Sequence, residues 1–175
     1  LVGIMDLSLS GSDGKAIHVR ATADIADLSI YGLGIANNGG GTDGVEFTFP
    51  TAAAAAGDNI LVARSASAME SYLGTCYGTY SAVFIDDGST NPNGSSAGVS
   101  QNGDDAIELF MTDGSAWNQV ELFGELDVDG TGQSWEYLDS WAYKADGAWT
   151  YGGVNCTDGS STTAESTCVY PACGG

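Results

Sequence analysis

Residues 101–144 read QNGDDAIELFMTDGSAWNQVELFGELDVDGTGQSWEYLDSWAYK, and this stretch decides the expected fold. It contains three apolar or alternating runs, at residues 106–111, 119–123 and 134–144, which are separated by Asp/Gly-rich turns. Runs of this length and pattern predict β-strands. The aromatic residues of the last run stand at odd positions, so they are expected on one strand face: Trp135, Tyr137, Trp141 and Tyr143.

Similar runs recur on both sides of this stretch, at residues 2–9, 16–22, 28–35, 45–49, 59–64, 80–85 and 149–151. Residues 65–73 show helical spacing instead, with a serine cap followed by Met69, Tyr72 and Leu73 on one face. The 175 residues fit one domain, and 26 glycines indicate many turns. Short strands with one short helix predict an all-β fold, an antiparallel β-sandwich.

Three motifs in this pattern resemble the lamin-tail domain, an immunoglobulin-like β-sandwich. They are NGDDAIELF (102–110), FGELDVDGTGQSWEYLDSWAYK (123–144) and DLSIYGLGIANNGGGTDGVEFTFP (27–50), the last followed by NILVA (Asn59–Ala63). The closest resemblance is to secreted bacterial and algal versions, which lack the coiled-coil rod of nuclear lamins. It implies an immunoglobulin-like sandwich over residues 1–151. Family members serve as accessory or adhesive modules, so the resemblance informs fold more than function.

The net charge is strongly negative, at −19, because four Lys and Arg residues face 23 acids. Nucleic-acid binding needs a basic patch that neutralises phosphates, so we expect no nucleic-acid partner. Attraction to an anionic membrane surface is disfavoured for the same reason. The sequence also lacks an apolar run of the roughly 20 residues that a membrane span needs.

The four cysteines predict two disulfides and an oxidising compartment, since their spacing does not fit a zinc site: Cys76, Cys156, Cys168 and Cys173. Three connectivities are open, and we favour Cys156–Cys168 with Cys76–Cys173. The chain starts at Leu1 without an initiator Met, so we interpret it as a mature secreted chain. Residues 152–175 are expected to form a Cys/Ser/Thr-rich tail, packed on the domain or on a neighbouring subunit.

The sequence shows no convincing pattern of catalytic residues. His18 is the single histidine, and its place in an alternating run predicts a surface or strand-edge side chain. Carboxylate pairs for glycoside hydrolysis occur at 104–105, 86–87 and 121/125, but 23 acids produce such pairs by chance. We expect no enzyme, and a secreted hydrolase is the weakest alternative.

One turn has the composition of a calcium loop. Asp127, Asp129 and Thr131 place oxygen ligands at alternate positions, and Glu125 or Glu136 would add another. The alternative is a tight acidic turn between two strands. No cofactor is required by the sequence, and calcium is the one it admits.

A second, weaker calcium candidate combines Asp86, Asp87 and Asn93. Asn93 and Asn155 are also N-glycosylation sequons in expected loops. The aromatic row at 135–143 has three interpretations: core packing, which alternation favours, a subunit interface, or a glycan-binding platform.

These observations favour a non-enzymatic, secreted structural or adhesive protein that assembles with copies of itself, as an extracellular filament or surface appendage. In one form of this hypothesis, residues 2–9 add to a sheet edge of a neighbouring chain. The alternative is a monomeric, calcium-dependent carbohydrate-binding or adhesion module.

Overall fold

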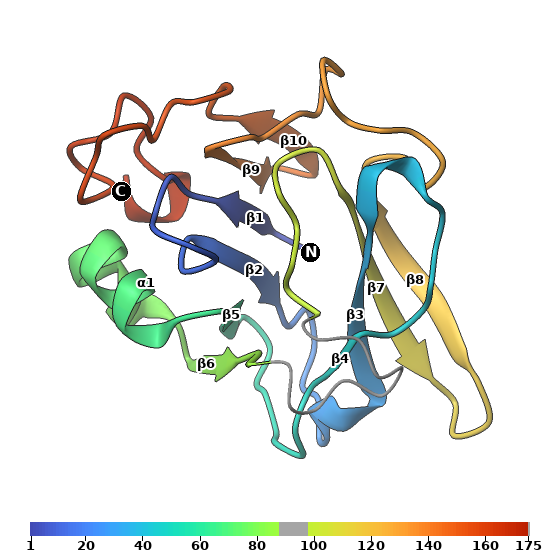
Figure 1. Ribbon diagram of the computed structural model, residues 1–175. Coiled ribbons are helices and arrows are strands. Elements are labelled where there is room, and N and C mark those ends of the chain that lie inside the picture. The colour runs from blue at the N-terminus through green and yellow to red at the C-terminus, as the bar shows by residue number, and fades with distance from the viewer. Residues whose placement is uncertain (88–97, 175) are drawn as a thin grey trace.

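The computed structural model describes residues 1–87 and 98–174, which contain two β-sheets, one short α-helix and two disulfides (Figure 1). The six-stranded sheet has the order β10-β9-β1-β2-β5-β6, and the four-stranded sheet has the order β4-β3-β7-β8. The strands are β1 (Gly3–Asp6), β2 (Lys15–Arg20), β3 (Tyr31–Ala36), β4 (Phe47–Thr48), β5 (Asn59–Ala63), β6 (Ala82–Ile85), β7 (Ala106–Thr112), β8 (Trp117–Phe123), β9 (Ser140–Ala145) and β10 (Ala148–Tyr151).

Both faces of the six-stranded sheet are buried. One face packs with the four-stranded sheet around an inter-sheet core that includes Ile4, Ile17, Ile60, Val62, Leu33, Ile35, Ile107 and Phe123. The opposite face packs with the helix and the C-terminal tail around an outer core that includes Met5, Leu61, Met69, Tyr72, Leu73, Trp141 and Tyr170. Successive residues of a strand point to opposite faces, so β5 feeds both cores and reads as the continuous apolar run NILVA.

The predicted helix is confirmed as α1 (Ala66–Leu73). Ser65 Oγ accepts a hydrogen bond from Ala68 N, and Gly74 ends the helix at a positive φ of 60°. The helix buries Met69, Tyr72 and Leu73 against the outer face of the sheet. An amphipathic stripe and a serine cap were therefore sufficient to locate this element.

The sheets are not antiparallel throughout. β5 and β6 pair in parallel, whereas the other strand pairs are antiparallel. Parallel neighbours need a crossover connection, and here it is formed by α1 and the 3-10 helix η3 (Gly74–Thr79). The expectation of a purely antiparallel arrangement is therefore wrong for this pair. The chain crosses the outer face of the sheet as α1, where it buries apolar residues, and so returns to the sheet in the same direction as β5.

The expected long strand at 134–144 is wrong in its first half. β9 starts at Ser140; Trp135 lies in a turn and Tyr137 in an irregular segment before it. Both side chains enter the inter-sheet core and pack edge-on against Phe123. Trp141 and Tyr143 lie on the opposite side, in the outer core. The four aromatic residues thus do not share a face, although their expected role in core packing is confirmed.

The first strand occupies the middle of its own sheet. β1 pairs with β2 on one side and with β9 on the other, so both of its backbone edges are used within the chain. The idea that residues 2–9 are donated to a neighbouring molecule is therefore wrong for the chain as folded. The sheet edges are β10, β6, β4 and β8.

The C-terminal tail folds back onto the outer face beside α1 (Figure 1). Disulfides join Cys76 to Cys173 and Cys156 to Cys168, which is the connectivity that the sequence favoured. Trp141 Nε1 donates to Cys168 O at 3.0 Å, and Tyr170 N donates to Thr163 Oγ1 at 2.8 Å. These contacts fix the tail to its own domain.

Candidate functional site

Two features of the fold are candidates for function: a pair of strand edges without Lys or Pro, β8 and β10, and a cavity between the sheets. The longest edge strand is β8, which within the described residues pairs with β7 alone. Its sequence, WNQVELF, contains no Lys or Pro, and its first four residues are exposed. A bulge interrupts the pairing with β7 at Leu109/Phe110. Trp117 and Val120 are 37% and 48% exposed, so this edge presents apolar side chains beside open backbone groups.

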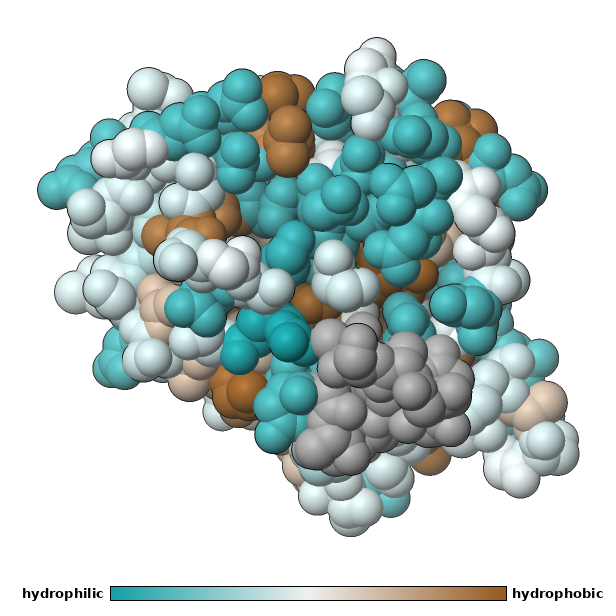
Figure 2. Space-filling model, in the orientation of Figure 1, coloured by the Kyte–Doolittle hydropathy of each residue, from teal (hydrophilic) through white to brown (hydrophobic). Residues whose placement is uncertain are grey.

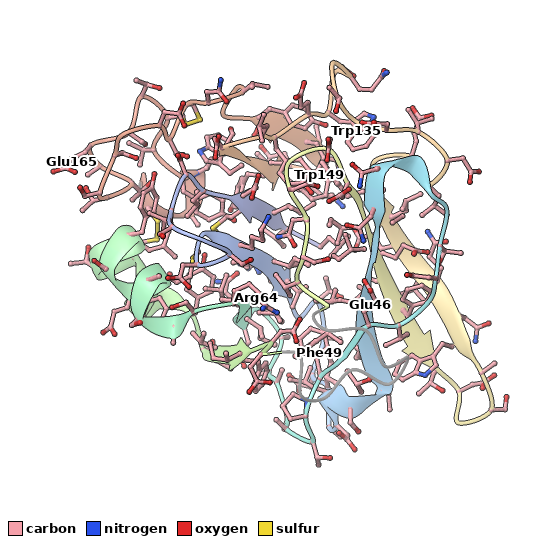
Figure 3. The ribbon with its side chains drawn as sticks, in the orientation of Figure 1. Glu46, Phe49, Arg64, Trp135, Trp149 and Glu165 are labelled. Carbon is pink, nitrogen blue, oxygen red and sulfur yellow. A yellow bond between two sulfur atoms is a disulfide. The ribbon has the colours of Figure 1, made fainter. Side chains whose placement is uncertain are left out.

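The β10 edge lies on the same side of the molecule as β8. Phe123 of β8 packs against Trp149 of β10 with ring centroids 4.7 Å apart. Trp135 packs against the same Phe123 ring with centroids 5.9 Å apart (Figure 3 labels both tryptophans). The opposite side carries β4 and β6, where Phe49 and Phe84 have centroids 6.0 Å apart. Each sheet therefore ends in one edge on each side.

The cavity lies between the sheets, beside the start of β1, and has a volume of about 410 Å³. The N-terminus that borders it lies between the two sheets in Figure 1. Its apolar lining includes Val19, Leu28, Tyr31, Phe49, Ile60 and Leu109. Arg20, Thr22, Glu121 and Lys144 provide its polar groups. Cavities of this size are typical of small-molecule sites.

The carboxylate of Glu121 is held between two cations at the border of the cavity. Leu1 donates to Glu121 Oε2 through its α-amino group at 2.5 Å, and Lys144 Nζ donates to Oε1. Burial alone would raise the pKa of Glu121, but hydrogen bonds from Lys144 and the α-amino group together lower it. Burial lowers the pKa of the α-amino group. Lys144 also lies 4.8 Å above the Trp149 ring.

The expectation that His18 lies at the surface is wrong. The side chain is 2% exposed, because the tail covers the outer face of β2. Its Nδ1 contacts Tyr170 Oη at 3.1 Å, and its Nε2 contacts Asn59 Oδ1 at 3.0 Å. An amide oxygen only accepts, so Nε2 carries the proton and Tyr170 donates to Nδ1. Burial lowers the pKa of His18 to about 4.

The structure uses the candidate calcium residues mainly to shape turns. Asp129 Oδ1 accepts from Thr131 N at 2.9 Å, and Thr131 Oγ1 donates to Asp104 Oδ2 at 2.8 Å. Glu136 Oε2 accepts from Gly132 N at 2.7 Å. In the part of the chain that the structure describes, no group of three or more His, Cys, Asp or Glu side chains could hold a metal ion. Calcium binding at Asp127, Asp129 and Thr131 stays a prediction.

The residues of the second calcium candidate are only partly described by the structure. Asp86 is buried, and its Oδ2 accepts from Val99 N at 2.5 Å. Asn93 lies outside the described residues, both as a ligand and as a glycosylation sequon. The other sequon residue, Asn155, is exposed in a turn after β10, where an attached glycan would meet solvent.

The adjacent carboxylates at 104–105 differ in environment. Asp105 is buried and accepts from Asn38 N at 2.7 Å and Asn102 N at 2.9 Å. Burial raises the pKa of Asp105 despite these hydrogen bonds. Asp104 instead binds Thr131 through its carboxylate. The pair thus connects three loops.

No protein-family model, curated protein or solved structure shows a significant match to this chain. The resemblance to the lamin-tail domain therefore rests on the sequence motifs quoted above. In the described part of the chain, every helix is too short or too polar to cross a bilayer. Two disulfides fit a secreted or extracellular protein.

Sequence signals could have indicated only part of this site. The missing Lys and Pro in WNQVELF could have marked an unprotected edge, but periodicity alone does not tell which strands lie at the edges. The cavity had no such signal, because its lining comes from segments between Leu1 and Lys144 that meet only in the folded chain.

Proposed function

We propose that this chain is a non-enzymatic, secreted structural or adhesive protein with an immunoglobulin-like sandwich of the lamin-tail type. In this proposal it assembles with copies of itself into an extracellular filament or surface appendage. The observation that carries the proposal is the exposed edge of β8, which has no Lys or Pro, although a bulge interrupts its pairing with β7. Natural proteins usually block such edges with Lys, Pro or covering segments, because a free edge pairs readily with another strand.

The arrangement of the edges supports an open assembly. β8 and β10 lie on one side of the molecule, and β4 and β6 lie on the other. Contact between unlike sides of successive copies would extend both sheets and repeat without closing. Pairing of β8 with β8 of a second copy would instead give a closed dimer. The face shown in Figure 2 is largely hydrophilic with separate apolar areas.

The environment of His18 supports a non-enzymatic role. A histidine that acts as a general base must reach the substrate, whereas His18 is enclosed by Tyr170, Asn59 and Tyr80. The alternative, a monomeric calcium-dependent carbohydrate-binding or adhesion module, has less support because Trp135, Tyr137 and Trp141 are buried.

The β8 edge is tested by adding a charge to it. Val120→Lys should abolish assembly and leave monomers, since a lysine on an edge strand opposes strand addition. Val169→Lys is the matched control, because Val169 is 41% exposed but lies in the tail. Negative-stain imaging and sedimentation velocity should show filaments for the unmodified chain and for the control.

Monodisperse monomers of the unmodified chain at all concentrations would refute self-assembly. Filaments of Val120→Lys would show that β8 is not the contact. Calcium-dependent signals on a glycan array from a chain that stays monomeric would favour the alternative function.

A further inference from the structure

Glu108 is a buried carboxyl group in the middle of β7. It is 1% exposed, and within the described residues neither of its side-chain oxygens has a hydrogen-bond partner. The ion pairs of the described part of the chain involve other carboxylates, those of Asp6 and Glu121. Burying an ionised carboxylate without a counter-charge is strongly unfavourable, so such a group either keeps a proton or holds a cation.

The loop at residues 40–46 covers this carboxyl group. Ile107 faces the inter-sheet core, so Glu108 points to the opposite, outer face of the four-stranded sheet. Its partner on β3 is Gly34, and a Cβ atom on Gly34 would lie 2.3 Å from Gly44 O. The loop backbone therefore passes directly over this strand pair, with a carbonyl oxygen directed at the sheet beside Glu108.

Two side chains of the loop bring further oxygen atoms to Glu108. Burial raises the pKa of Glu108, the nearby Thr42 hydroxyl lowers it, and the Asp43 carboxylate raises it again, so that the net shift is upward. Asp43 makes no ion pair within the described residues. Thr42 and Asp43 are both exposed, so a cation could reach Glu108 from solvent through the loop. Two neighbouring carboxylates without a Lys or Arg between them attract such a cation.

The donor atoms select the kind of cation. Carboxylate, hydroxyl and backbone carbonyl oxygens are ligands of calcium, which accepts about six to eight of them in flexible geometry. Magnesium demands a nearly ideal octahedron and retains several waters, which an irregular loop satisfies less well. Nitrogen and sulfur ligands, which zinc prefers, do not occur in residues 40–46.

We infer that Glu108 and the loop above it form a calcium site, in which Glu108, Asp43, the Thr42 hydroxyl and the Gly44 carbonyl supply oxygen ligands and water completes the shell. This site differs from the Asp127, Asp129 and Thr131 turn. It does not depend on assembly, since it requires one chain only. Because two carboxylates contribute, we expect a dissociation constant of about 0.1–1 mM, the range of extracellular calcium modules.

Equilibrium dialysis of the full chain against calcium chloride tests the inference. Sodium chloride at about 0.15 M screens the diffuse attraction of calcium to the net charge of −19. We expect one saturable calcium ion per chain. Glu108→Gln keeps the shape of the side chain and removes its charge, and it should weaken this binding by roughly tenfold or more, since even indirect supports of a metal site are worth that much.

Two controls locate the site. Glu70→Gln makes the same change of charge on the exposed side of α1 and should bind calcium as the unmodified chain does. Asp129→Asn alters the other calcium candidate and should also leave this binding unchanged. Thermal unfolding supplies an independent measurement, because calcium should raise the Tm of the unmodified chain and of both controls, but not that of Glu108→Gln.

Asp43→Asn alters an exposed side chain and should weaken calcium binding as well, so the test does not depend on whether Glu108→Gln folds. Absence of saturable binding, or equal affinity in Glu108→Gln and the unmodified chain, would overturn the inference. Equal weakening in Glu108→Gln and Glu70→Gln would also overturn it, because it would show diffuse attraction to net charge. Loss of binding in Asp129→Asn alone would place the ion in the other turn.

Discussion

A single side chain of the outer core, His18, makes the stability of the fold depend on pH. His18 is neutral when folded because burial lowers its pKa from 6.5 to about 4. In the unfolded chain, His18 therefore binds a proton below about pH 6.5. In the folded chain, it does so only below about pH 4. Stability from this residue is complete above pH 6.5 and is lost as pH falls toward 4, by about 3 kcal/mol in total.

We expect His18→Gln to remove this part of the acid sensitivity, since glutamine offers a donor and an acceptor without a proton to gain. Urea unfolding at pH 7 and at pH 4 measures the difference between the two chains. Asp6, Asp105 and Glu108 act in the opposite direction, because burial raises their pKa values and acid relieves that cost. The unmodified chain and the variant share these carboxylates. An equal loss of stability in both would contradict the role of His18.

At the scale of elements, the two disulfides stabilise the fold to different degrees. Cys76–Cys173 joins positions 97 residues apart, whereas Cys156–Cys168 joins positions 12 residues apart. Closing a longer loop removes more entropy from the unfolded chain. The long-range bond also holds the tail beside η3, next to α1.

Replacing Cys76 and Cys173 by Ala should therefore cost about 4.5 kcal/mol, and replacing Cys156 and Cys168 about 3 kcal/mol. Denaturant unfolding of the two double variants measures both values, and each serves as the control for the other. A larger loss for the Cys156/Cys168 pair would show that tail packing, and not loop closure, determines the order.

The elements also show how far sequence reasoning extends. Local signals located α1 and most strands, because a cap and an alternating pattern act over a few residues. The same alternation misled at 134–144, where Trp135 and Tyr137 reach the core from a turn and an irregular segment before β9. The burial of His18 and the parallel pairing of β6 depend on segments distant in sequence, so no local pattern reveals them.

For the whole molecule, net charge opposes the proposed assembly. Copies with a charge of −19 repel one another at low salt. Raising ionic strength from about 0.01 M to 0.15 M shortens the screening length from about 30 Å to 8 Å. We expect filaments to form at a lower protein concentration in the higher salt, as measured by light scattering and checked by imaging.

Val120→Lys is the control for this experiment and should remain monomeric at both salt concentrations. Assembly that weakens with salt would contradict the proposal of contact through backbone pairing of strand edges, because it would indicate an interface made of ion pairs. This experiment does not test calcium binding, since sodium chloride screens charge without supplying a divalent cation.

The glycine at position 3 shows how the tail limits change elsewhere in the chain. A Cβ atom on Gly3 would lie 1.8 Å from Tyr170 Oη, so no larger residue fits while Tyr170 is in place. Gly3, His18 and Tyr170 consequently pack as one unit. A related chain that had lost the tail would be released from all three constraints together, and it would accumulate substitutions at positions 3 and 18 in parallel with the loss of Cys76.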